Sequence, residues 1–185
     1  MNPVHKLIRG YKKLRGVSVR VFVTFRCNLR CPYCTVLAGR KLNCDEISAK
    51  DWIRIIETFP IRINKVSLIG GEPFIYPDIV ELANGLMDRG YLVTILTNLT
   101  RKHNFKNSYK LHLYATYHKS KVYHADFYSG YNITHSELGS SQLGYKVKGW
   151  CDPEADCNVF DFAPDGVLHT SFQRMLDYYD ENKLR

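Results

Sequence analysis

The chain has 185 residues, of which 45% are hydrophobic and 24% are charged, an ordinary composition for one globular domain with a small appendage. No apolar run approaches membrane-spanning length, and the basic N-terminal residues lead into no apolar core of a signal peptide. We therefore expect a cytoplasmic protein with no membrane partner. The formal net charge of +8 permits an acidic protein partner or a phosphorylated substrate, but no nucleic-acid-binding signature accompanies it.

Strands and helices are predicted to alternate up to residue 118. Apolar, β-branched runs indicate buried strands, and apolar residues at i, i+3, i+4 spacing indicate helices. In chain order the predicted elements are a strand over 17–25, a helix that the Ser48 capping box opens and Pro60 stops, and a strand over 65–69. A second helix with Pro77 in its first turn and Gly90 just past its end follows, and then strands over 91–96 and 111–118. This order indicates a parallel α/β sheet with right-handed crossovers.

Three polar motifs follow three of these strands directly. They are Cys27 to Cys34 after the first strand, Gly70 to Pro73 after the second, and Thr97-Asn98 after the third. Because the carboxyl ends of parallel strands meet at one edge of a sheet, we expect the three motifs to form one site.

The first motif places three thiols within eight residues, at Cys27, Cys31 and Cys34. Six cysteines in a cytoplasmic chain indicate metal or redox chemistry before disulfides. Three clustered thiolates with no fourth are typical of a catalytic metal site, because closed structural sites use four ligands.

The second half of the chain carries a weaker signal. Residues 119–150 are rich in Tyr, Ser, Gly and His without a clear period. Residues 158–170 indicate a hairpin around Pro164-Asp165-Gly166, and residues 172–184 are compatible with a terminal helix. Tyr117, Tyr123, Tyr128 and Tyr131 either line a substrate pocket or pack as core aromatics, and packing is favoured.

These residues resemble a known family. The Cys-x3-Cys-x2-Cys spacing, with Tyr33 before the last cysteine, resembles the signature of the radical S-adenosylmethionine (radical SAM) superfamily. The string from Phe25 to Cys34 is similar to that of its molybdenum-cofactor and peptide-maturing branch. Gly70-Gly71-Glu72-Pro73 and Thr97-Asn98 resemble the family's second-strand and third-strand motifs, so the likeness spans roughly residues 17–118.

The resemblance implies two cofactors. Cys27, Cys31 and Cys34 would hold three irons of a [4Fe-4S] cluster, and the fourth iron would bind S-adenosyl-L-methionine (SAM). Reductive cleavage of SAM would give methionine and a 5′-deoxyadenosyl radical that abstracts hydrogen from a substrate. A flavodoxin- or ferredoxin-type reductant is the implied partner, and the substrate could be a peptide, a nucleotide or a small molecule.

Seven further residues are predicted to contact SAM. Paired glycines allow close approach of backbone to a ligand, and a carboxylate beside exposed carbonyls can accept from the methionine ammonium. For the asparagine and threonine, a strand-end cap or packing role is the alternative. The predicted residues are Tyr33, Gly70, Gly71, Glu72, Pro73, Asn98 and Thr116.

The chain departs from the family pattern in length. A full core has six βα units, so we expect an incomplete parallel (β/α) barrel over residues 1–150, with residues 151–185 as a small extension that is not an independent domain. That extension resembles a degenerate auxiliary-cluster (SPASM or twitch) segment: Cys151 or Cys157 and Gly166 fit, but Ser171 stands where a cysteine is expected. We expect Cys44, Cys151 and Cys157 to be structural or weakly metal-binding.

Two alternatives remain at this point. A zinc-stabilised binding module would use the three clustered cysteines with Cys44 or a histidine as the fourth ligand. A non-catalytic protein of radical SAM-like fold would keep the cluster but bind little SAM.

Overall fold

The computed structural model describes residues 16–31, 34, 36–37, 41–117, 123–137, 159–169 and 172–180. The predictions for Tyr33, Cys151, Cys157 and Ser171 lie outside these residues. The elements in chain order are β1 (Val17–Thr24), α2 (Ala49–Glu57), β2 (Ile63–Gly70), the 3-10 turn η1 (Pro73–Ile75), α3 (Ile79–Asp88), β3 (Leu92–Thr97), β4 (Leu111–Tyr117), η2 (Asp126–Tyr128), β5 (Asn132–Glu137), β6 (Val159–Phe162), β7 (Leu168–His169) and α5 (Phe172–Tyr179).

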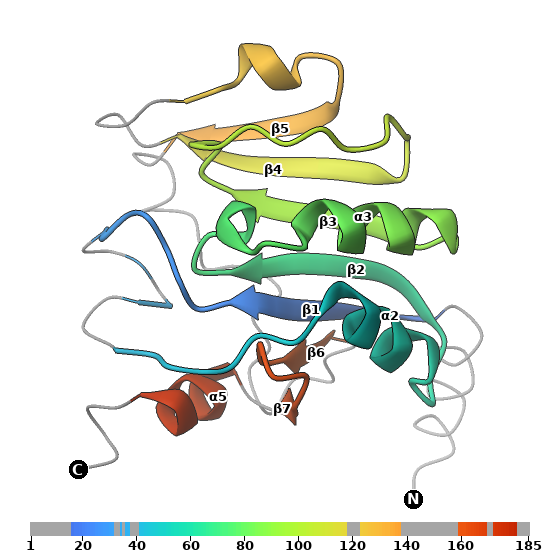
Figure 1. The fold of residues 1–185 in the computed structure, drawn as a ribbon, viewed down its shortest axis with the longest axis vertical. Coiled ribbons are helices and arrows are strands. Elements are labelled where there is room, and N and C mark those ends of the chain that lie inside the picture. The colour runs from blue at the N-terminus through green and yellow to red at the C-terminus, as the bar shows by residue number, and fades with distance from the viewer. Residues whose placement is uncertain are drawn as a thin grey trace, which may run out of the picture.

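The described strands form one sheet in the order β5-β4-β3-β2-β1-β6-β7 (Figure 1). Every neighbouring pair is parallel except β6 and β7, which form the predicted hairpin. Within the described part of the chain the sheet does not close, since β5 and β7 are its two edges. The predicted incomplete parallel barrel is therefore confirmed.

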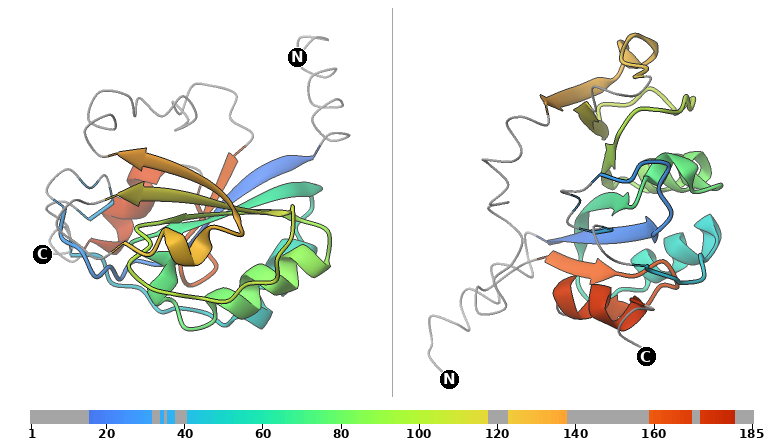
Figure 2. Two further views of the ribbon diagram at one scale, coloured as in Figure 1. Left: turned by 90° about the horizontal axis from the view of Figure 1, so that it is seen from above. Right: turned by 90° about the vertical axis from the view of Figure 1, so that its left-hand side faces the viewer.

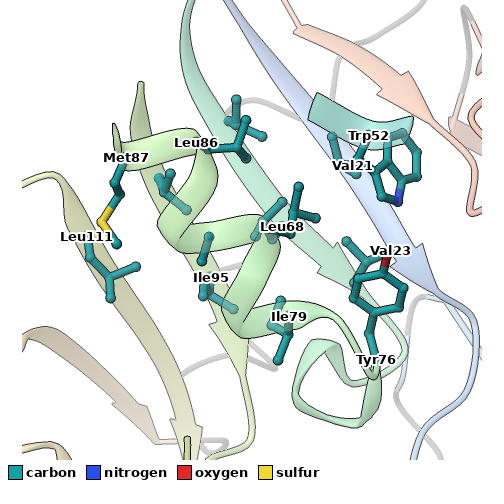
Figure 3. Packing of buried hydrophobic residues seen from close by; sticks show 14 of the residues in the cluster. Val21, Val23, Trp52, Leu68, Tyr76, Ile79, Leu86, Met87, Ile95 and Leu111 are labelled. Atoms are coloured by element: carbon teal, nitrogen blue, oxygen red, sulfur yellow. The ribbon is translucent and has the colours of Figure 1, made fainter. Parts of the chain in front are cut away.

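Helices α2 and α3 cover one face of the sheet (Figure 2). Val19, Val21 and Val23 alternate along β1 toward that face and are fully buried. Figure 3 shows how Trp52 of α2 and Ile79 and Leu86 of α3 pack over the strands, with Leu68, Ile95 and Leu111 contributed by β2, β3 and β4. This apolar layer fixes the strand order that brings the three motif-bearing strand ends together.

A second, smaller apolar cluster lies on the opposite face. Phe22 and Ile69, which alternate with the residues of the first layer, pack with Met175 and Tyr179 of α5. Cys34 and Cys44 are partly buried against the same cluster. The C-terminal helix therefore supports the segment that carries the cysteines.

Side-chain oxygens of two residues accept from the backbone at the start of α2. Ser48 caps α2 as predicted, since its Oγ accepts from the backbone N–H of Asp51 at 3.2 Å. The predicted start of the next helix was wrong by two residues: Pro77 precedes the Asp78 cap and α3 begins at Ile79. Asp78 instead accepts from the N–H of Ala49 at 3.1 Å, so its carboxylate joins the starts of both helices.

The connection between β3 and β4 contains no helix. Two tyrosine hydroxyls hold its backbone in place. The Tyr128 hydroxyl accepts from the N–H of His103 at 2.6 Å and donates to the carbonyl of Arg101, and the Tyr131 hydroxyl bonds both backbone groups of Phe105. The favoured packing role of these two tyrosines agrees with this arrangement.

The pairing of β6 with β1 was not predicted. Asp161 of β6 and Arg20 of β1 occupy paired register positions and form a two-pronged ion pair, with N–O distances of 2.5 and 2.7 Å. Asp161 is 4% exposed, so the pair is largely shielded from water. The C-terminal hairpin thereby extends the same sheet beyond β1.

None of the helices in the described ranges is long and apolar enough to span a membrane.

Candidate cofactor site at the carboxyl edge of the sheet

The segments that follow β1, β2 and β3 meet at one edge of the sheet, where the strand arrowheads point in Figure 1. Backbone pairing between β1 and β2 continues past the strands themselves. The N–H of Gly71 donates to the carbonyl of Thr24 at 2.9 Å, and the N–H of Glu72 donates to the carbonyl of Arg26 at 2.8 Å. The Gly-Gly-Glu-Pro turn is therefore bonded to the residue that immediately precedes Cys27.

The two glycines of this turn are required by that backbone contact. A Cβ on Gly70 would lie 2.1 Å from the carbonyl oxygen of Thr24, and a Cβ on Gly71 would lie 2.2 Å from that of Arg26. Gly70 also has a φ of +142°, a backbone angle that residues with a side chain rarely adopt. In this structure the close approach that the glycines permit is between two segments of the chain, which brings the two motifs together.

Glu72 is buried beneath the turn, with 1% of its surface exposed. Its carboxylate accepts from the N–H of Phe74 at 2.9 Å, from the Thr97 hydroxyl at 2.6 Å and from the N–H of Asn98 at 2.7 Å. Burial raises the pKa of Glu72 to about 7, against the opposing effect of these three donors. The Glu72 side chain, which we expected to accept from the SAM ammonium, is thus hydrogen-bonded inside the protein, and its contact with SAM stays a prediction.

Cys27, Cys31 and Cys34 are free thiols of intermediate exposure. The sulfur of Cys27 accepts from the N–H of Leu29 at 3.4 Å, and that of Cys34 accepts from the N–H of Leu37 at 3.2 Å. The N–H of Cys34 donates to the carbonyl of Cys31 at 3.1 Å, which closes a turn between these two cysteines. Backbone N–H groups that donate to a cysteine sulfur stabilise its thiolate form and help to set the reduction potential of an iron–sulfur cluster.

The charges around Cys27 favour a cationic occupant. Burial raises the pKa of the Cys27 thiol, the Leu29 N–H lowers it, and the negative charges of Glu72, Cys34 and Cys31 raise it further. Thiolates gathered in this way repel one another unless a metal compensates their charge. The donor set therefore fits a group that carries several positive metal ions.

A single zinc ion and an iron–sulfur cluster require different arrangements of the ligand side chains. Among the residues that the structure describes, no three His, Cys, Asp or Glu side chains converge to hold one metal ion. A zinc site needs such convergence, whereas each thiolate of a [4Fe-4S] cluster binds a different iron. Cys44, which with a histidine as the alternative was the expected fourth zinc ligand, has a thiol pKa raised to about 12 by burial and by the charge of Asp165.

The remaining predicted SAM contacts divide into two groups. Pro73 is buried and begins η1, and Asn98 is 6% exposed and hydrogen-bonded within the site. Thr116 is half-buried near the end of β4, one position beyond the Thr97–Ala115 register pair, so it lies at the same edge of the sheet. Its contact with SAM stays a prediction.

Sequence reasoning missed two residues that hold the cysteine segment. The Glu46 carboxylate accepts from the Thr24 hydroxyl. It also accepts from two guanidinium nitrogens of Arg26, from Nε at 2.8 Å and from Nη2 at 2.6 Å. Asn28 bonds both Asn98 and Thr100. Asn28 carried a usable signal, because it is a polar residue inside the cysteine motif, but Glu46 lies in an irregular segment and carried none.

Residues 21–119 match the sequence profile of the Radical SAM superfamily, which is more than half of the chain. The chain therefore belongs to the radical SAM superfamily, an enzyme family whose cofactors are a [4Fe-4S] cluster and SAM.

Curated relatives match over part of this region. The chain is 36% identical over 105 residues to the GTP 3′,8-cyclase of Lactiplantibacillus plantarum, covering 51% of this chain and 30% of that protein. It is 34% identical over 83 residues to the PqqA peptide cyclase of Methylorubrum extorquens, covering 44% and 22%. The matched segments thus span less than a third of these relatives' length.

Solved structures share the fold. BtrN in complex with AdoMet and 2-DOIA has a TM-score of 0.57 at 14% identity, covering 85% of this chain and 73% of that chain. Streptococcus suis SuiB bound to S-adenosylmethionine has a TM-score of 0.51 at 15% identity, covering 98% and 72%. At these identities the likeness concerns the fold alone.

Proposed function

We propose that this chain is a radical SAM enzyme in which Cys27, Cys31 and Cys34 hold a [4Fe-4S] cluster and the Gly70–Pro73 turn receives the methionine end of SAM. The observation that carries the proposal is the pair of backbone bonds that joins this turn to Thr24 and Arg26. These bonds bring the cysteine motif and the Gly70–Pro73 turn together at the carboxyl edge of the sheet, although the two motifs are about forty residues apart in the sequence.

When bound, the cluster and SAM supply a 5′-deoxyadenosyl radical for hydrogen abstraction. The protein's own residues orient the cofactors. Backbone N–H groups of Leu29 and Leu37 donate to two of the ligand sulfurs, and the buried Glu72 carboxylate fixes the turn against the end of β3. The carbonyls of the turn then act as acceptors for the SAM ammonium.

The names of the relatives suggest two substrate classes for this chain, a guanine nucleotide and a peptide. We favour a peptide. The sheet face opposite α2 and α3 keeps two apolar side chains accessible on β3, Leu92 at 46% and Leu96 at 41% exposure, which suit apolar peptide side chains better than a triphosphate. If added GTP, but no peptide, stimulates 5′-deoxyadenosine formation, this choice is wrong.

An electron donor completes the proposal. A flavodoxin- or ferredoxin-type protein is acidic, and the exposed Arg30 lies beside Cys27, where it donates to the Cys27 carbonyl at 2.9 Å. We place the protein in the cytoplasm, because its free thiols must stay reduced to bind iron.

A matched pair of cysteine variants tests the metal assignment. Anaerobic reconstitution of the wild type should give about four irons and four sulfides per chain. Cys31→Ala should lose most of this content, because it removes one of three ligands. Cys44→Ala should keep it, because Cys44 lies outside the Cys-x3-Cys-x2-Cys motif and its thiol bonds the carbonyl of Asp45.

One zinc per chain without sulfide would support the zinc-stabilised module instead. Equal iron loss in both variants would show that Cys44 is a ligand and that the assignment is wrong. A full cluster in a protein that binds no SAM by calorimetry would identify the non-catalytic alternative.

A further inference from the structure

Asn28, the residue that follows Cys27, links the cysteine segment to the segment after β3. Its side-chain nitrogen donates to the Thr100 hydroxyl at 2.6 Å, and its side-chain oxygen accepts from the amide of Asn98 at 3.0 Å. Asn28 itself is exposed, so it is not a core residue that happens to find partners.

The partners of Asn28 are themselves fixed. The Asn98 side-chain oxygen accepts from both the N–H and the hydroxyl of Thr100, at 3.0 and 2.6 Å. Leu99 between them has a φ of +50°, an uncommon conformation for leucine that persists only where its surroundings determine it. Its N–H donates to the Thr97 hydroxyl at 3.1 Å. The segment after β3 is therefore a rigid support.

These contacts close a ring around Cys27. On one side, the carbonyl of Arg26 accepts from the N–H of Glu72. The Glu72 carboxylate accepts from the N–H of Asn98, and the Asn98 amide donates to Asn28 on the other side of the cysteine. Both chain neighbours of Cys27 are thus bonded into one network that includes the Gly-Gly-Glu-Pro turn.

We propose that Asn28 is a positioning residue that fixes Cys27 relative to the Gly70–Pro73 turn, and that Asn98 acts through Asn28 in the same role. The inference rests on the proposed function, in which Cys27 ligates an iron and the turn receives SAM. Without the Asn28 bridge, the cysteine segment would lose its side-chain link to the segment after β3 and would keep the backbone bond of Arg26 to Glu72 and the contact of Arg30 with the Cys27 carbonyl. Supporting hydrogen bonds of this kind around metal ligands typically contribute 10- to 100-fold to metal affinity or activity.

The test compares Asn28→Ala with Asn28→Asp and a control. The aspartate keeps the acceptor for Asn98, loses the donor to Thr100 and adds a negative charge beside Cys27. The control is Asn84→Ala on α3, which removes an asparagine that also accepts a backbone N–H, from Lys106 at 2.9 Å, but on an element outside the site. All variants are made in the full chain.

Two measurements are made on each protein. The first is hydrogen exchange of the metal-free chain, in which Asn28→Ala should speed exchange at residues 27–31 and 98–100 and leave the strands unchanged. The second is the rate of iron loss from the reconstituted protein to a chelator, which should rise about tenfold in Asn28→Ala. Asn28→Asp, which keeps one of the two bonds, should fall between Asn28→Ala and the wild type in hydrogen exchange, and Asn84→Ala should match the wild type.

A double variant separates a shared bridge from independent contacts. Thr100→Val removes the other end of the bridge, so Asn28→Ala combined with Thr100→Val should lose iron no faster than Asn28→Ala alone. Fully additive effects would show that the two residues act separately and would overturn the proposal.

Failure of the inference and failure of the proposed function are distinguishable. If the wild type assembles no cluster, the proposed function fails, and hydrogen exchange alone decides whether Asn28 anchors the cysteine segment. If exchange at residues 27–31 and iron loss are unchanged in Asn28→Ala while the wild type holds its cluster, the positioning role is wrong.

Discussion

Glu72 organises the site from within. Its carboxylate receives three donors from η1, β3 and the residue after β3, and only 1% of its surface is exposed. A carboxylate in this position joins two motif-bearing segments, and its removal would leave three donors without an acceptor. Its contribution to function is therefore the shape of the turn above it.

The raised pKa of Glu72 predicts a specific pH dependence of stability. Its ordinary value of 4.5 is raised to about 7 by burial, so between these values the folded chain holds a proton that the unfolded chain has lost. The stabilising contribution is full below the unfolded value and is lost as the pH rises through about 7. From pH 5.5 to 8, about 2 kcal/mol should be lost through this residue.

The measurement is urea unfolding of the metal-free chain at both pH values, for the wild type and for Glu72→Gln. The glutamine cannot titrate, so the difference between the two proteins isolates Glu72 from every other ionisable group. The wild type should lose more stability than the variant on going to pH 8. Identical pH dependence in the two proteins would show that Glu72 does not titrate in this range.

The sequence could identify the motif residues but not the direction of their side chains. Spacing and strand position predicted that Cys27, Glu72 and Asn98 would meet, because parallel strands share an edge. Whether a carboxylate points outward or inward depends on donors such as the N–H of Asn98, which become neighbours only after folding. The Asn28 bridge escaped notice for the same reason.

Among the elements, the connection between β3 and β4 departs most from the regular βα repeat. Tyr128, which is fully buried, replaces a helix as the support of this segment together with Tyr131. The ring of Phe74 packs 5.7 Å from that of Tyr128, so the same aromatic layer also rests against the turn after Glu72.

Removing the Tyr128 hydroxyl should therefore destabilise the chain. Tyr128→Phe leaves the N–H of His103 and the carbonyl of Arg101 without their partner, and we expect a loss of about 2 kcal/mol in the free energy of unfolding. Tyr109→Phe is the matched control, since Tyr109 is 83% exposed. Comparable losses in both variants would mean that the hydroxyl bonds contribute nothing specific.

Hydrophobic periodicity predicted the strongly patterned elements and failed for β5. That strand has the sequence Asn-Ile-Thr-His-Ser-Glu, in which Ile133 is the single apolar residue and packs against the core. An edge strand with so little apolar surface has no periodic signal, and its pairing with β4 depends on backbone hydrogen bonds that every residue can form.

At the scale of the whole molecule, the sheet combines distant parts of the sequence. β6 lies beside β1 although about 140 residues separate them, and the ion pair of Arg20 with Asp161 marks the contact. One charged residue in each of two apolar strands was a signal that the sequence offered. It could not name the partner, because strand order is decided by packing of the complete chain.

The family match ends at residue 119, yet α5 supports the cysteine segment from the other end of the chain. Phe25, two residues before Cys27, packs on Tyr179 with ring centres 5.5 Å apart. The C-terminal part therefore supports the same site as the region that matches the family.

The central claim is that the site formed by the three cysteines and the Gly70–Pro73 turn binds and cleaves SAM. The most direct measurement is the formation of 5′-deoxyadenosine and methionine by the anaerobically reconstituted, chemically reduced wild-type protein, with Cys31→Ala as the control. We predict equal amounts of both products from the wild type and none above background from the variant. A fully assembled cluster that binds SAM but yields no 5′-deoxyadenosine would contradict the claim.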